Sequence, residues 1–330
     1  MGGVNNIIKL VSTVLAACAV PLFFFFSGYL FFAKTEKLTK EIYYKKLKSR
    51  VKSLLVPYLF WTLLGVVIYG LLANLPYTRN IFGKGNFELS WRYIGEQITG
   101  LKLVDGEHTY QIEYHLWFLR DLFLMVIISP LIYIAVKNKK QLMPVFLIIL
   151  WIIGPVLSLG TTGINTSSFV FFGLGAYFSV NKINFITKFE QIAPLSYMLY
   201  PCLVFVNWVQ LWTHPLYTMP ELYVGMLHAA MILAAIPYWC NITSLLVRKN
   251  LIKNIDWFAT ASFFVYLIHI PFILPQVKKL LYYLTNPQSQ EMLAILYFGV
   301  VFGTIAIALV LYWIMQKLCP RFTKVITGGR

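Results

Sequence analysis

The stretch from Glu113 to Asp121, EYHLWFLRD, gathers side chains that can do chemistry at one point of the chain. Glu113 and His115 are titratable, and histidine is the side chain most often used as a general acid or base. Arg120 and Asp121 carry opposite charges next to each other, which lowers the cost of holding either ion at the end of an apolar segment. The pattern predicts a place where a polar substrate enters.

Two aromatic residues, Tyr114 and Trp117, lie among these charged groups. Both residue types concentrate at the membrane–water interface, so alone they indicate an interfacial belt. Their titratable neighbours favour a second explanation, in which they line the entry of the substrate. Tyr114, Trp117, Arg120 and Asp121 are therefore our candidate substrate-binding residues.

A second histidine, His269, lies in the apolar stretch ASFFVYLIHIPFI at 261–273. An ionisable residue inside a membrane span is a candidate functional residue by default, because an unpaired polar ring in hydrocarbon is costly. His214 and His228 are weaker candidates. His214 falls in a short loop beside Pro215, and His228 can be paired inside a helix bundle.

A dense run of positive charge follows the phenylalanine-rich segment VPLFFFFSGYLFF at 20–32 and exceeds what membrane orientation requires. Its members are Lys34, Lys37, Lys40, Lys45, Lys46, Lys48, Arg50 and Lys52. One explanation is attraction to anionic lipid, worth on the order of 1 kcal/mol for each residue near the surface. The functional explanation is a site for an anionic cytoplasmic ligand that carries phosphate groups. Within the phenylalanine-rich segment, Ser27 and Gly28 taken by themselves indicate a site where a neighbouring helix packs closely.

The composition of the chain indicates what positions these groups. Of its 330 residues, 59% are hydrophobic and only 12% are charged, and the mean hydropathy of +0.70 is far outside the balance of soluble domains. Apolar runs long enough to cross a membrane recur with short polar interruptions. They are apolar on all sides, unlike the strands of a membrane barrel, so we expect an all-α polytopic transmembrane bundle. The nine predicted spans are 11–32, 54–75, 117–136, 142–159, 166–180, 191–211, 222–247, 257–275 and 292–316.

The net charge of +16 does not indicate nucleic-acid binding, because the charge lies in short loops between apolar runs. Counted on alternate sides of the predicted spans, 20 of the 28 lysines and arginines lie on one side, which the positive-inside rule makes cytoplasmic. The four cysteines have no metal-ligand spacing, so we expect neither a disulfide framework nor a metal site.

Nine spans with a cytoplasmic C-terminus put the N-terminus outside. The first residues, MGGVNNIIKLVST, lack the features that usually send a short segment across a membrane. Either one inbound helix is absent from the start of the chain, or this weakly charged N-terminus inserts unaided. The charge distribution favours neither explanation.

Three of these segments together resemble the acyltransferase-3 family of integral membrane acyltransferases, which modify bacterial surface glycans. VPLFFFFSGYLFF is similar to the family's Phe-Phe-x-x-Ser-Gly-Tyr span, and YHLWFLRDLFLM to its His-Leu-Trp-Phe-Leu span. SFFVYLIHIPF is similar to its Ser-x-x-x-Tyr-Leu-x-His segment, and the basic run leading into LLVPYLFW to its cytoplasmic loop. The motifs occur in family order over about residues 18–275.

The resemblance implies a single membrane domain over residues 1–330. It would move an acetyl or similar acyl group from acetyl-CoA, held on the cytoplasmic side, to a hydroxyl of an extracytoplasmic sugar. Lysine and arginine would neutralise the CoA phosphates, and no metal would be needed. The residues of the acyl-CoA site would be Lys46, Lys48, Arg50, Ser27, Gly28 and Tyr29.

On the acceptor side, a histidine would act as general base; we choose His115 for this role, with His269 and Glu113 completing the predicted catalytic set. Glu113 and Trp117 would orient the sugar, the indole by stacking on its apolar face. Family members usually have ten spans, and the first carries an arginine and a histidine tied to acyl transfer, which no segment before Val20 supplies. Three explanations would account for this departure: the coding start is misplaced, the protein is a truncated and inactive member, or His115 or His269 replaces the missing histidine.

Two other functions fit the composition. In a polysaccharide transporter or flippase, the histidines and the aromatic residues at the ends of the spans would line a pathway for the sugar. Such a protein is expected to have pseudo-symmetric halves, and the sequence has no convincing internal repeat. An inactive family remnant could serve as a membrane scaffold or sensor. The expected location is the bacterial cytoplasmic (inner) membrane. The expected partners are acyl-CoA, a cell-surface glycan or lipid-linked sugar and membrane lipid, and no nucleic acid.

Overall fold

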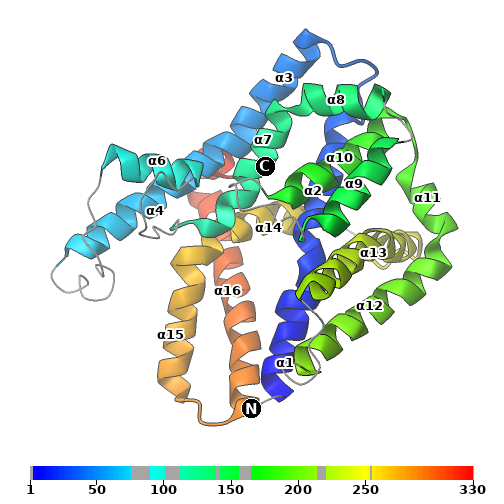
Figure 1. Cartoon of the computed structure of the whole chain (residues 1–330). Coiled ribbons are helices and arrows are strands. Elements are labelled where there is room, and N and C mark those ends of the chain that lie inside the picture. The colour runs from blue at the N-terminus through cyan, green and yellow to red at the C-terminus, as the bar shows by residue number, and fades with distance from the viewer. Residues whose placement is uncertain are drawn as a thin grey trace. The chain divides into compact units, whose positions relative to one another are not determined.

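The computed structural model describes residues 3–75, 90–100, 112–138, 142–155, 165–213, 221–252 and 255–329. Every regular element in these ranges is a helix, and no strand occurs among them (Figure 1). Up to residue 138 they are α1 (Gly3–Lys9), η1 (Leu10–Leu15), η2 (Ala16–Cys18), α2 (Ala19–Phe32), α3 (Lys40–Arg50), η3 (Val51–Leu55), α4 (Val56–Asn74), α6 (Trp91–Thr99), η4 (Tyr114–Leu116), α7 (Trp117–Ile127) and α8 (Ser129–Asn138). They continue with α9 (Leu142–Ile153), α10 (Thr166–Val180), α11 (Phe185–Gln191), α12 (Ala193–Thr213), α13 (Glu221–Arg248), α14 (Asp256–Ile268), η5 (His269–Ile273), α15 (Leu274–Thr285), α16 (Gln290–Leu318) and α17 (Pro320–Ile326).

Several helices are long and apolar enough to cross a membrane. Within the described part of the chain, five segments pass this test, and seven do so if each of two bent helix pairs counts as one span. The five are Asn6–Phe32, Lys40–Asn74, Leu222–Arg248, Asp256–Thr285 and Gln290–Leu318, and the bent pairs are Tyr114–Ile127 with Ser129–Lys137 and Thr166–Val180 with Phe185–Gln191. The predicted all-α transmembrane architecture is confirmed, and the count of nine spans stays a prediction.

The helices group into two compact units. Unit 1 comprises Met1–Tyr43, Met125–Ile255 and Gln288–Ile295, and unit 2 comprises Tyr44–Leu124, Asp256–Pro287 and Leu296–Arg330. The single domain expected over residues 1–330 stays a prediction.

In unit 1, α2 and α10 pack with their backbones in contact. A Cβ atom on Gly28 would overlap the carbonyl oxygen of Phe172, and a Cβ atom on Gly175 would overlap that of Phe25. Glycine is therefore required at both positions, as in other close helix crossings inside membranes. The ring of Phe25 also meets that of Phe185, with centroids 5.5 Å apart. Gly28 thus serves the packing that the sequence suggested for it.

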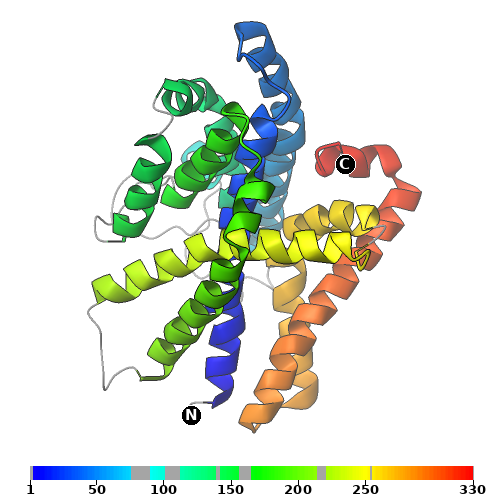
Figure 2. The ribbon, with the colours of Figure 1, turned by 90° about the vertical axis from the view of Figure 1, so that its right-hand side faces the viewer.

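In unit 2, α4 contacts the C-terminal helix. The Nε1 of Trp61 on α4 donates a hydrogen bond to the carbonyl oxygen of Ile326 on α17 (3.2 Å), and the Trp61 ring lies 6.0 Å from that of Phe264 on α14. Figure 2 shows α17 turning away from the end of α16, at the position where Pro320 starts the new helix. α4, α14 and α17 therefore share one core.

The predicted span at 257–275 is a broken helix. α14 ends at Ile268, and Ile270 has extended backbone angles (φ −121°, ψ 139°) before α15 continues to Thr285. The change of direction between α14 and α15 is visible in Figure 1. Pro271 explains the break, because proline lacks the N–H that a helix needs and disfavours helical angles in the residue before it. As a result, His269 lies at a helix end instead of in the middle of a continuous span.

Candidate active site

The helix α6 holds the backbone just before Glu113, the first residue of the candidate site. Ser90 caps its N-terminus by accepting a hydrogen bond from the N–H of Tyr93 (3.1 Å), and Gly100 ends it in a left-handed conformation (φ 67°). The buried side chain of Gln97 accepts a hydrogen bond through Oε1 from the N–H of Ile112 (2.7 Å). α6 therefore holds the residue that precedes the predicted catalytic stretch.

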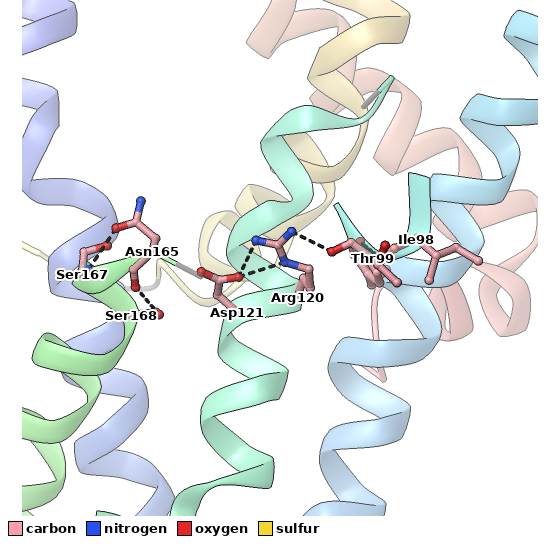
Figure 3. Close-up of polar contacts among 8 residues, drawn as sticks. Ile98, Thr99, Arg120, Asp121, Asn165, Ser167 and Ser168 are labelled. Carbon is pink, nitrogen blue, oxygen red and sulfur yellow. Dashed lines mark hydrogen bonds and ion pairs between the residues drawn. The ribbon is translucent and has the colours of Figure 1, made fainter. Parts of the chain in front are cut away.

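Arg120 ties the start of α7 to the same helix (Figure 3). Its Nη1 donates to the carbonyl oxygen of Thr99 (2.9 Å), and its Nε and Nη2 donate to Oδ1 of Asp121 (2.9 and 2.8 Å). The Asp121 side chain is fully buried. Removing one partner of a buried ion pair leaves an uncompensated charge, so this contact anchors the structure. The role of Arg120 and Asp121 in substrate binding stays a prediction.

Glu113 and His115 lie side by side in the interior of unit 2. Their side chains are 3% and 8% exposed, and Oε2 of Glu113 is 3.7 Å from Nδ1 of His115, too far for a hydrogen bond. Among the described residues, no atom makes a hydrogen bond with either carboxyl oxygen or either ring nitrogen. Buried polar atoms are rarely left unpaired. The four atoms therefore keep a hydrogen-bonding capacity that no described residue uses.

Gly65 on α4 leaves space for the carboxyl group of Glu113. A Cβ atom at this position would lie 2.7 Å from Oε1 of Glu113 and 3.0 Å from its Cγ. Burial raises the pKa of Glu113, which precedes the membrane-spanning helix, to about 9. At neutral pH the side chain is therefore an uncharged carboxylic acid that can donate a hydrogen bond.

His269 comes from η5, and its ring contacts that of His115. The ring centroids are 4.8 Å apart, with an angle of 72° between the planes. The Nδ1 of His269 lies 2.7 Å from the carbonyl oxygen of Tyr266. Because a carbonyl oxygen only accepts, Nδ1 carries a proton, and in the neutral form of the ring Nε2 then keeps a lone pair. The three residues predicted to be catalytic, Glu113, His115 and His269, thus lie together, and their roles stay a prediction.

Tyr266 belongs to this cluster, and sequence reasoning missed it. Its hydroxyl donates a hydrogen bond to the carbonyl oxygen of His115 (2.6 Å), and the two rings lie 5.4 Å apart. Tyr266 precedes His269 by one helical turn in the same apolar segment. Two signals pointed to it: the tyrosine of the Ser-x-x-x-Tyr-Leu-x-His segment is Tyr266, and residues three apart share a helix face.

The aromatic candidates differ in exposure. Tyr114 is exposed, while the next residue, His115, is buried. Trp117, at the start of α7, is half-buried. Their roles in sugar binding stay predictions.

The predicted phosphate-binding residues lie on α3, in unit 2. Lys46 and Arg50 are one helical turn apart and both are partly buried, whereas Lys48 is exposed. Lys46 and Arg50 therefore share a face of the helix, because residues four apart are neighbours on its surface. Lys48 lies on another part of that surface.

The other residues assigned to the acyl-CoA site lie on α2, in unit 1. Gly28 is closed off by α10, and Ser27 is half-buried. Tyr29 lines a cavity of about 560 Å³ together with Lys34 and Lys182. The role of these residues in binding a donor stays a prediction.

Two further histidines were weaker candidates in the sequence. His228 is half-buried on α13, in unit 1, and His214 lies outside the described residues. In the part of the chain that the structure describes, no group of three or more His, Cys, Asp or Glu side chains could hold a metal ion. The expected metal-free chemistry stays a prediction.

Comparisons with known proteins cover nearly the whole chain. Residues 2–313 match the acyltransferase domain of the acyltransferase-3 family. The chain is 25% identical over 322 residues to the succinoglycan biosynthesis protein ExoH of Rhizobium meliloti (strain 1021), which covers 94% of this chain and 79% of that protein. No solved structure matches it. Because the domain match extends over almost every described helix, the chain belongs to the acyltransferase-3 family of membrane acyltransferases.

Proposed function

We propose that the protein is an O-acyltransferase that moves an acetyl or similar acyl group from cytoplasmic acyl-CoA to a hydroxyl of an extracytoplasmic glycan. Family membership supports acyl transfer. The observation that carries the proposal is the buried cluster of Glu113, His115 and His269, in which two ring nitrogens and two carboxyl oxygens have no partner among the described residues. A sugar hydroxyl is a group that could pair with them.

His115 is the general base in this mechanism. A ring nitrogen takes the proton of the sugar hydroxyl as the hydroxyl oxygen bonds to the acyl carbonyl carbon. The carbon–sulfur bond to CoA then breaks, and the proton passes to the departing sulfur, so that CoA leaves as a thiol. General acid–base catalysis of this kind typically contributes about 10²–10⁴-fold.

Glu113 and His269 assist the base. Because burial keeps Glu113 protonated at neutral pH, it does not compete for the proton of the sugar, and it can donate a hydrogen bond to the acceptor or to the oxyanion that develops. His269 keeps a lone pair on Nε2 beside the His115 ring and is a second proton acceptor there.

The donor binds through its phosphates. Lys46 and Arg50 occupy one face of α3 and would neutralise the phosphate charge, Arg50 through its planar fork of N–H groups. The excess of lysine and arginine in loops on one predicted side supports a cytoplasmic position for this helix and for the C-terminus. These features support an inner-membrane enzyme with its donor on the inside.

The acceptor is a glycan or lipid-linked sugar. The support is the relative in Rhizobium meliloti, which is described as a succinoglycan biosynthesis protein. Trp117, which is half-buried and follows His115 by two residues, would stack on the sugar ring.

The test uses inverted membrane vesicles from cells with and without the protein, supplied with radiolabelled acetyl-CoA or succinyl-CoA. Label should enter the glycan fraction only when the protein is present. The His115→Gln variant should lower the rate of this labelling by about 10²-fold or more, while the matched His228→Gln variant in unit 1 should retain it. Equal labelling by wild type and His115→Gln would contradict the proposed mechanism, and absence of labelling with both donors would contradict the proposed reaction.

A further inference from the structure

Tyr266 contacts both histidines of the candidate site through different atoms. Its hydroxyl donates to the carbonyl oxygen of His115 at 2.6 Å, and its own carbonyl oxygen accepts the Nδ1–H of His269 at 2.7 Å. Its ring lies 5.4 Å from the His115 ring and 6.1 Å from the His269 ring. One residue therefore links the 3₁₀ turn η4 to the broken helix.

The backbone at His115 depends on such a link. η4 is a single 3₁₀ turn, Tyr114–Leu116, and Glu113 before it has non-helical angles (φ −95°, ψ 51°). A single turn has few hydrogen bonds of its own, so contacts from outside must set the direction of its side chains. The Tyr266 hydroxyl supplies one directly at the catalytic candidate.

The carbonyl oxygen of Tyr266 has a separate effect. By accepting from Nδ1, it fixes both the orientation of the His269 ring and the nitrogen that keeps the lone pair. This contact comes from the main chain, so a change in the Tyr266 side chain leaves it in place. The two functions of the residue can therefore be tested separately.

We infer that Tyr266 is a positioning residue that holds His115 and His269 in register for acyl transfer, its hydroxyl acting on His115 and its carbonyl on His269. The inference rests on the proposed function, because it assigns both histidines to the chemistry. A displacement of about 1 Å in a catalytic group can cost about 100-fold in rate.

The decisive variant is Tyr266→Phe, which removes only the hydroxyl. We expect kcat for acyl transfer to fall by about 10-fold to 100-fold, with KM for acyl-CoA and for the acceptor within about twofold of wild type. The matched control is Tyr312→Phe on α16. Tyr312 is fully buried in the same unit, and its hydroxyl accepts a hydrogen bond from Nε2 of Gln316 (2.7 Å). The control loses one buried hydrogen bond but should keep its kcat.

A double variant separates positioning from general structural support. In a His115→Gln background, Tyr266→Phe should cause no further loss of the residual activity, because the residue to be positioned is gone. A further loss of about 10-fold there would overturn the inference, and so would an unchanged kcat in the single variant.

Hydrogen–deuterium exchange tests the contact without any need for activity. Amides in the peptide covering residues 112–118 should exchange faster in Tyr266→Phe than in wild type, and at the wild-type rate in Tyr312→Phe. Unchanged exchange in Tyr266→Phe would overturn the positioning role even if the protein is an active acyltransferase. Faster exchange in a protein that transfers no acyl group would instead refute the proposed function while supporting the contact.

Discussion

The imidazole rings of His115 and His269 lie 4.8 Å apart, although His115 belongs to the 3₁₀ turn η4 just before α7 and His269 directly follows the end of α14. Both belong to unit 2, and the carboxyl group of Glu113 lies beside the first of them. This arrangement makes the roles of the individual side chains testable.

Loss of either histidine should reduce acyl transfer by different amounts. We expect His115→Gln to lower kcat by about 10²-fold or more, because it removes the base, and His269→Gln to have a smaller effect. Single-turnover transfer from radiolabelled acetyl-CoA in nanodiscs measures both. If His269→Gln were the more damaging change, the base would have to be reassigned to Nε2 of His269.

Replacement of Gly65 by alanine should disturb the site without removing any of its polar side chains. The new Cβ atom would overlap the Glu113 carboxyl group, so we expect at least about a 10-fold loss of activity. The matched control is Gly95→Ala on α6, where a Cβ atom would meet nothing within 4 Å. That variant should keep its activity and melt at the same or a higher temperature, since alanine favours helices. Equal activity in the two variants would show that the space around Glu113 does not matter.

Glu113→Gln should remove a pH dependence of stability. The pKa of Glu113 is about 9 in the folded protein, against an ordinary value of 4.5. Below about pH 4 the carboxyl group is protonated in both the folded and the unfolded state, so its burial costs the folded state no charge. As the pH rises toward about 9, the unfolded state gains stability by releasing the proton, and the free energy of unfolding falls. The melting temperature of the wild type should fall between pH 5 and 9 more than that of Glu113→Gln, whose side chain is always neutral. Superimposable melting curves across that range would show that Glu113 ionises normally.

Removal of positive charge from α3 should weaken donor binding. Lys46→Gln and Arg50→Gln should each raise the dissociation constant for acetyl-CoA by about 10-fold, because charge-assisted hydrogen bonds are among the stronger ones. Lys48→Gln should have a smaller effect because its side chain is exposed. Calorimetry in neutral-lipid nanodiscs measures this, with Lys279→Gln on α15 as the charge-matched control. Binding that is unchanged in the Lys46→Gln, Arg50→Gln double variant would remove α3 from the donor site.

Ser27 and Gly28 should respond differently to substitution. Gly28→Ala should lower the melting temperature and the yield of folded protein, because its Cβ atom would meet the backbone of Phe172. Gly299→Ala, where the nearest atom would be 3.7 Å away, should be tolerated. Ser27→Ala should leave stability unchanged and raise the dissociation constant for acetyl-CoA if the hydroxyl takes part in donor binding. A stable Gly28→Ala variant would contradict the close packing of α2 on α10.

The amino-acid sequence by itself determined the class of the protein. Long apolar runs can satisfy their backbone groups in lipid only as helices, so composition was enough to predict an all-α membrane protein. Local motifs were enough to suggest the family and to single out Glu113, His115 and His269. Each of these inferences depends on residues close together in the chain.

Tertiary structure decided which of those residues meet. The contact of His115 with His269, the hydrogen bond from Tyr266 and the space that Gly65 leaves for Glu113 all join separate helices of unit 2. Helix periodicity describes one face of one helix, whereas these contacts depend on how α4, η4 and the broken α14–η5 segment pack together. The side-chain shapes and backbone breaks that fix this packing act over long sequence separations, which is why the sequence could name the catalytic candidates but not their geometry.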